Sequence, residues 1–224
     1  LGIMSAEEYV EFAAQRIAEA IGQAWKARKP GGVSFGLAYA TTGRNRLTAY
    51  HHGTSEMYGA VNTPDFSHVE GYEDHSLGLL YTWDVKGHLT GVVINIATPS
   101  QVAYGRQISA DFWHETRTEL RRRLGEELFI LPQASAAGDQ APRVLVDERA
   151  EKRMEKLTGR TQMEQIGIRI SDAVTSILPC MKENIDPNPV FAHRVEQVEL
   201  KRRVITEKDL TTRRSTFHNK KAES

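Results

Sequence analysis

Residues 77–97, LGLLYTWDVKGHLTGVVINIA, predict the centre of the fold. Apolar side chains occupy alternate positions through the first part of this stretch: Leu77, Leu79, Tyr81, Trp83 and Val85. This period of two is typical of a β-strand with one packed face. Lys86 and Gly87 suit a tight turn, and residues 89–97 return as a mostly apolar second strand. We therefore expect a β-hairpin within a buried sheet.

Two further strands and one helix are predicted beside this hairpin. Residues 33–39 alternate in polarity and size, and residues 127–132, ELFILP, form a short apolar run, so both segments favour strands. Residues 109–125 predict a helix that Ser109 caps and Gly125 ends. Its three consecutive arginines, 121–123, lie where the helix dipole favours cations, so we favour a solvated helix end over a phosphate site.

Two longer helices are predicted by capping boxes followed by apolar side chains at three- and four-residue spacing. Ser5 and Glu8 begin a helix that reaches about residue 28, and Thr161 and Glu164 begin one that reaches about residue 178. A shorter polar helical stretch precedes the second helix. Helices and strands interleaved in this order indicate an α/β or α+β fold, in which a mixed β-sheet is layered with helices.

The remaining segments have weaker patterns. Residues 41–75 are rich in Gly, His, Asn, Thr and acids without a sustained period, and they predict a long loop. Residues 190–206, VFAHRVEQVELKRRVIT, alternate enough to predict a strand with an exposed charged face. We expect residues 1–205 to be part of one α/β domain, and residues 206–224 to form a polar helical or flexible terminal segment.

The composition excludes several classes of protein. The chain has 29 basic and 29 acidic side chains, so it has no net field that would attract a nucleic acid. One cysteine, Cys180, excludes an internal disulfide, and no apolar run approaches the roughly 20 residues of a transmembrane helix. The first residues resemble the middle of a longer chain, so we expect a fragment whose upstream part is missing. The compartment and the oligomeric state stay open.

Common catalytic and metal-binding motifs are absent from the sequence. Four histidines and two acids lie in the predicted long loop at residues 41–75: His51, His52, His68, His75, Glu70 and Asp74. None has a tight spacing such as H-E-x-x-H, so histidines of a surface loop are favoured over a bound ion. The G-x-S-x-G elbow, the P-loop and the G-x-G-x-x-G turn do not occur.

The segment SAAGDQA, residues 135–141, is the strongest candidate for a reaction centre. Small side chains follow a predicted strand and leave room for a cavity, and Gly138 lets backbone amides approach a ligand or an oxyanion. Asp139 and Gln140 would lie at the rim of that cavity. Gly, Asp and Pro also make an ordinary turn for steric reasons. On the residues alone, the two interpretations are equal.

Several segments, in the same order, resemble the neutral/alkaline (non-lysosomal) ceramidases, a family of zinc-dependent amidases. SAAGDQAPR, residues 135–143, is similar to the N-x-G-D-x-S-P-N segment that carries the family's nucleophilic serine. The other matching segments are TTGRNR (41–46), GYEDHSLGLLYTWDVKGHLTGVVINIATPS (71–100), SADFW (109–113) and GRTQMEQIG (159–167). The resemblance covers about residues 30–180 and implies a divergent fragment of a ceramidase-like catalytic domain. Its specific part is the Gly-Asp-x-x-Pro loop.

The resemblance implies roles for three residues and also two losses. Arg46 would project into the active site and hold an anionic or carbonyl oxygen, while Gly138 and Asp139 would shape the nucleophile loop, which also contains the candidate Gln140. Ala141 stands where the family has its serine, and a methyl group cannot attack a carbonyl. Ala97 stands where the family has a zinc-binding histidine. The family's other zinc ligands would fall outside residues 1–224, so zinc is the family's cofactor but the ligand set here is incomplete.

Two functional hypotheses follow, and a third possibility is an unrelated α/β domain. The first is a divergent hydrolase that acts on an amide or ester bond of an N-acyl, lipid-like or glycan-like small molecule, with Asp139 or an upstream group activating water and Arg46 stabilising charge. The alternative is a catalytically inactive relative that binds such a ligand in the retained cleft. The sequence leaves both open.

Overall fold

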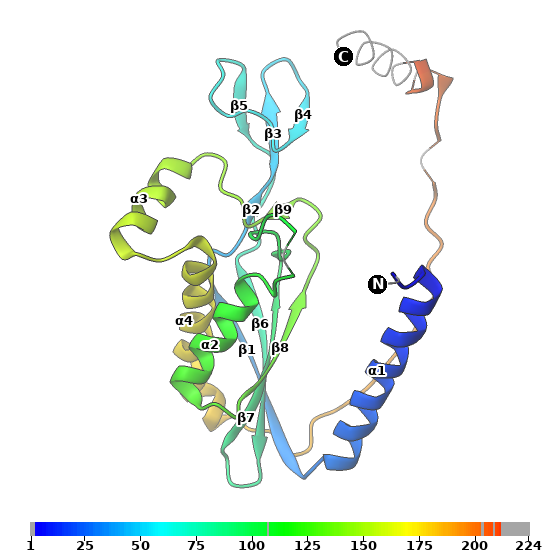
Figure 1. The fold of residues 1–224 in the computed structure, drawn as a ribbon, viewed down its shortest axis with the longest axis vertical. Coiled ribbons are helices and arrows are strands. Elements are labelled where there is room, and N and C mark those ends of the chain that lie inside the picture. Colours follow the sequence, from blue (N-terminus) through cyan, green and yellow to red (C-terminus); the bar gives the residue numbers. More distant parts are fainter. Residues whose placement is uncertain (1–2, 107, 203, 208, 212–224) are drawn as a thin grey trace. The chain divides into compact units, whose positions relative to one another are not determined.

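A computed structural model describes residues 3–106, 108–202, 204–207 and 209–211. Its centre is a four-stranded mixed sheet in the order β1-β6-β7-β8 (Figure 1). These strands are β1 (Gly31–Tyr39), β6 (Ser76–Asp84), β7 (Leu89–Ile96) and β8 (Phe129–Ala134). β1, β6 and β7 pair antiparallel, and β8 runs parallel to β7. The predicted hairpin, the two flanking strands and the α/β class are confirmed.

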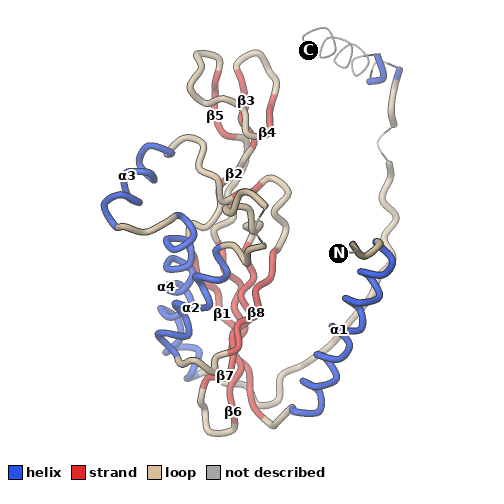
Figure 2. The backbone as a smooth tube through the Cα atoms, viewed as in Figure 1, coloured by secondary structure: helices blue, strands red, loops and turns tan. Residues whose placement is uncertain are grey.

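Two helices, α2 (Phe112–Leu124) and α4 (Gln162–Glu183), pack on one face of this sheet and on each other (Figure 2). The alternate side chains of β6 that predicted the hairpin, from Leu77 to Trp83, are buried in the core between sheet and helices. The opposite face is not covered in the same way. A row across it pairs Phe35, Leu80, Val93 and Leu131 in register, and Phe35 is 65% exposed. The sheet is therefore buried on one face and not on both.

The helix ends show which capping predictions were correct. Ser5 and Thr161 both form full capping boxes, at the starts of α1 (Ala6–Ala27) and α4. α2 is capped by Asp111 and not by Ser109, whose hydroxyl instead accepts a hydrogen bond from the Asp111 amide. α4 continues past the predicted end to Glu183, because tertiary packing holds its last turn: Met181 is packed against the core.

The predicted loop over residues 41–75 is wrong, because this segment contains short strands. A three-stranded sheet has the order β4-β3-β5, and a two-stranded sheet pairs β2 with β9. The bounds are β2 (Arg44–Asn45), β3 (Leu47–Tyr50), β4 (Ser55–Met57), β5 (Phe66–Val69) and β9 (Gln140–Ala141). Strands of two to four residues are too short to show a period, so the pattern concealed them.

The predicted strand over residues 190–206 is also wrong. The described residues of this segment form no strand, and its apolar side chains are exposed, with Phe191 at 94%. An alternating pattern becomes a strand only where a partner strand completes its hydrogen bonds. The chain divides into two compact units, Leu1–Pro189 and Val190–Ser224. Residues 212–224, most of the predicted terminal segment, lie outside the described residues.

α3 (Glu148–Thr158) is the predicted polar helix. Neither α3 nor α1 contains a fully buried residue. Within the described part of the chain, we find no helix with the length and apolar character needed to cross a bilayer.

Candidate functional site

The candidate site forms where β2 pairs with β9. Arg44 pairs with Ala141, and Asn45 pairs with Gln140. The pairing extends past the strands, because the amide of Arg46 donates a 2.8 Å hydrogen bond to the carbonyl of Asp139. The structure thus brings the segment at 44–46 against the loop at 138–141, although about 90 residues separate them in the chain. All five residues singled out from the sequence lie along this junction.

Arg46 is half-buried and holds the loop through its guanidinium group. One terminal nitrogen, Nη2, donates to the carbonyl of Gly138 at 2.7 Å, and Nη1 donates to the hydroxyl of Tyr58 at 3.1 Å. The third nitrogen, Nε, is buried and has no hydrogen-bond partner among the described residues. Arg46 therefore reaches the glycine loop, and its described hydrogen bonds go to neutral oxygens.

Asn45 joins three segments at the junction and is only 2% exposed. Its side-chain amide donates to the carboxylate of Asp139 at 3.1 Å, and its side-chain oxygen accepts from the amide of Leu47 at 2.9 Å. Its own amide donates to the carboxylate of Glu73 at 3.1 Å. Sequence reasoning did not assign Asn45 a role, although it is half of the Asn-Arg pair in TTGRNR. These contacts tie Asp139 to the scaffold.

Gln140 does not lie at a cavity rim, as the sequence suggested. It is 3% exposed, and its side-chain amide donates to the carbonyl of Tyr72 at 3.2 Å. Its side-chain oxygen Oε1 is buried without a hydrogen-bond partner in the described chain. The pairing of β9 with β2 turns this side chain inward, so what looked like a free loop is half strand.

Ala141 and Ala97 are each 1% exposed. Thr98, beside Ala97, shares a 2.8 Å hydrogen bond with the hydroxyl of Thr42. Neither alanine side chain has an atom that could attack a carbonyl or bind a metal ion. Over the part of the chain that the structure describes, no group of three or more His, Cys, Asp or Glu side chains is arranged to hold a metal ion.

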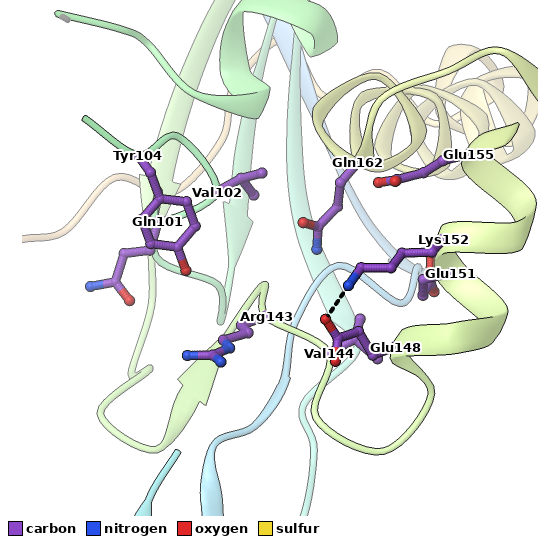
Figure 3. Close-up of a pocket in the computed structure, with 10 residues that line it drawn as sticks. All are labelled: Gln101, Val102, Tyr104, Arg143, Val144, Glu148, Glu151, Lys152, Glu155 and Gln162. Carbon is purple, nitrogen blue, oxygen red and sulfur yellow. Dashed lines mark hydrogen bonds and ion pairs between the residues drawn. The ribbon is translucent and has the colours of Figure 1, made fainter. Parts of the chain in front are cut away.

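A cavity of about 410 Å³ lies beside the candidate loop (Figure 3). Arg143, two residues beyond Ala141, lines it together with Gln101 and Tyr104 on one side and Lys152 and Gln162 on the other. On one side of the cavity, Lys152 pairs with Glu148 of the same helix, α3, at 2.6 Å, and this contact is the main reason why the pKa of Glu148 is lowered. The sequence predicted a site at residues 138–141. The lining of the nearby cavity instead includes residues that follow this loop, Arg143 and Val144.

Comparison with known proteins gives a match of structure only. No protein-family model and no curated protein matches the chain. The crystal structure of neutral ceramidase from Pseudomonas aeruginosa superposes with a TM-score of 0.53 and 16% identity, over 77% of this chain and 26% of that one. A structure described as ceramidase complexed with C2 has a TM-score of 0.46 and 17% identity, over 69% of this chain and 23% of that one.

This chain spans about a quarter of the length of the Pseudomonas protein. At this level of identity, the likeness concerns the fold and not the site. The chain has an α/β fold similar to that of neutral ceramidase.

Proposed function

We propose that this chain binds an N-acyl or lipid-like small molecule on a ceramidase-like scaffold without hydrolysing it. The observation that carries the proposal is the pair of buried methyl groups at Ala141 and Ala97. By the sequence resemblance, these positions hold the nucleophilic serine and a zinc-binding histidine in the ceramidases. Losing both groups removes covalent attack and metal activation of water together, while the scaffold around them is kept.

The surroundings of Asp139 also favour binding over hydrolysis. A general base must reach the proton that it abstracts from water. One oxygen of the Asp139 carboxylate accepts a hydrogen bond from the Asn45 amide, so that oxygen already has a positioning role. The carbonyl of the same residue pairs with the amide of Arg46. Asp139 thus serves the junction between β2 and β9.

A divergent hydrolase is the second candidate function. It is favoured by one arrangement: Asp139 and the cation of Arg46 meet at the same glycine loop. In that case Asp139 would activate water, and Arg46 would stabilise the negative charge that develops on the substrate oxygen. The bond cleaved would be an amide or an ester.

One pair of measurements separates these candidates. N-dodecanoylglycinamide and N-dodecanoylglycine are titrated into the protein by calorimetry, and release of free amine is followed over hours. We expect saturable binding of at least one compound and no amine release above the rate without protein. Amine release that survives a chelator and disappears in Asp139→Asn would establish the hydrolase instead. If neither compound binds and neither is cleaved, the proposed function is wrong.

A further inference from the structure

Two arginines approach a single aromatic ring next to the cavity. The guanidinium carbon of Arg46 lies 5.6 Å from the ring centre of Tyr58, and that of Arg143 lies 5.4 Å from it. The three residues follow three different strands, β2, β4 and β9. Tyr58 has a φ of 58°, a left-handed conformation that is unfavourable for a residue with a side chain. Its amide donates to the carbonyl of Arg46 at 2.7 Å, which helps to hold it there.

These two cations lack the carboxylate partners that neighbouring arginines have. Arg44 and Arg169 share the carboxylate of Glu151, at 3.5 and 3.3 Å. Among the described residues, no carboxylate lies within ion-pair distance of Arg46 or Arg143. The Nε of Arg46 is a buried donor with no acceptor in the described part of the chain. Positive charge is therefore concentrated at this ring with no acid of the described chain bound to it.

Two acids near this cluster have other partners. Asp139 is hydrogen-bonded to Asn45, and Glu148 is paired with Lys152. The contact with Lys152 is the main cause of the lowered pKa of Glu148, and the charge of Arg143 lowers it further by a smaller amount. Arg143 is exposed and is thus available to an external anion, while the half-buried Arg46, whose two Nη atoms bind Tyr58 and Gly138, adds positive charge beside the same ring.

The cavity supplies room for the uncharged part of such a ligand. Arg143 belongs to its lining, and so do the apolar side chains of Val102 and Val144 and the ring of Tyr104 (Figure 3). The carboxylates of the lining belong to α3, the helix that also carries Lys152: Glu148, Glu151 and Glu155. Arg143 also occupies the last position of the segment similar to N-x-G-D-x-S-P-N, where the resembled motif has a neutral asparagine. The charge of Arg143 is thus an addition to that motif, at the point where the loop meets the cavity.

We propose that Arg46, Tyr58 and Arg143 form a binding site for the anionic head group, a carboxylate or a phosphate, of the ligand whose uncharged part occupies the adjacent cavity. This inference rests on the proposed binding function and specifies the class of ligand. Guanidinium groups bind carboxylate and phosphate oxygens through paired, charge-assisted hydrogen bonds. The ring of Tyr58 positions both groups through its face and, for Arg46, through its hydroxyl.

The test compares ligands that differ only in charge. N-dodecanoylglycine carries a carboxylate near neutral pH, and N-dodecanoylglycinamide has the same chain with a neutral head. We expect the acid to bind about tenfold more tightly, since hydrogen bonds to charged groups are the stronger class. Dodecyl phosphate, measured beside them, shows whether a phosphate head binds as well as a carboxylate. Inorganic phosphate is expected to compete with the acid and not with the amide.

Three variants test whether Arg143 causes the preference for the acid over the amide. Arg143 is exposed, so Arg143→Gln is expected to fold normally and to lose most of the preference for the acid. Arg143→Lys keeps the charge and should retain part of it. Arg28→Gln is the matched control, because Arg28 is an exposed arginine over the ring of Trp25 in a helix end far along the chain from the site. It should leave both affinities unchanged.

Three results would overturn the inference in different ways. Equal affinities for the acid and the amide, unchanged in Arg143→Gln, would show binding without an anion site, and the proposed function would survive. If Arg28→Gln reduces the preference for the acid as much as Arg143→Gln does, the preference comes from general attraction to basic side chains and not from this site. Absence of binding by every amphiphile would remove the proposed function itself.

Discussion

Replacing Asn45 by alanine should destabilise the junction between β2 and β9. The substitution removes the hydrogen bond to the Asp139 carboxylate at 3.1 Å and the one from the Leu47 amide at 2.9 Å. A hydrogen bond to a charged group contributes about 1.5–3 kcal/mol and one between neutral groups about 0.5–1.5 kcal/mol. Because Asn45 is buried, water cannot fully replace either bond. We expect Asn45→Ala to lower the free energy of unfolding by about 2–4 kcal/mol.

The assay is urea unfolding followed by tryptophan fluorescence. Asn95→Ala is the control, because Asn95 makes a single exposed contact of 3.5 Å with Gln133 and should cost at most about 0.5 kcal/mol. Hydrogen exchange of the amides at 45–47 and 139–141 should increase in Asn45→Ala and not in the control. If the two variants are equally stable, the network around Asn45 does not hold the loop and the reasoning fails.

The dependence of the stability of Asn45→Asp on pH tests the same contact between residues 45 and 139. It keeps the size of the side chain but places a second carboxylate against that of Asp139. Like charges raise the pKa of such a pair in the folded protein above its value in the unfolded chain. The destabilisation should therefore be largest near pH 7 and should shrink as the pH falls toward about 4, where the folded pair retains a proton. An unfolding midpoint that differs from wild type by the same amount at both pH values would contradict the proximity of the two groups.

Three further changes probe the helices, each measured by urea or thermal unfolding. Gly167→Ala places a Cβ 2.9 Å from the Cβ of Glu115, where α4 meets α2, and should lower the free energy of unfolding by about 1–3 kcal/mol. An unchanged free energy of unfolding would mean that the two helices separate easily. Thr161→Ala removes the capping box of α4 and should lower the free energy of unfolding by about 1 kcal/mol. Thr161→Ser keeps a capping hydroxyl and should retain most of that stability. Glu119→Gln removes the partner of Arg122, whose hydrogen bond is the main reason why the pKa of Glu119 is lowered to about 2. The stabilisation from that pair, up to about 1 kcal/mol, should be fully present above pH 4.5 and be lost as the pH falls through about 2. A difference from wild type that is as large at pH 2 as at pH 7 would refute its assignment to the charge.

Local signals explain which parts of the fold the sequence predicts. The strands of the central sheet run for six to nine residues, long enough for their alternating side chains to be recognised. The capping boxes at Ser5 and Thr161 join residues three positions apart, so they are visible without any tertiary contact. The cap of α2 differs, because Asp111 also accepts from the amides of Val102 and Ala103 at 2.8 and 2.7 Å, in a preceding segment that local rules do not include.

The candidate site shows the same division. The sequence pointed to Arg46 only through the resemblance to the ceramidases. It pointed to residues 138–141 also through their small side chains and Gly138, and it suggested that Gln140 faces a cavity. In the structure β2 and β9, two residues each, turn Gln140 inward and bring Arg46 to Gly138. No local pattern marks strands so short, because their stability comes from the partner strand and not from their own residues.

The sequence by itself determined the central sheet, its covering helices and the absence of a serine and a histidine at Ala141 and Ala97. Only the tertiary structure decided that Asn45 binds Asp139, that two arginines approach the ring of Tyr58, and that Arg143 lines the cavity. The physical reason is the range of the interactions. Helices and long strands repeat a pattern between near neighbours, whereas the site depends on contacts between residues that are far apart in the chain, and those contacts exist only after the strands have paired.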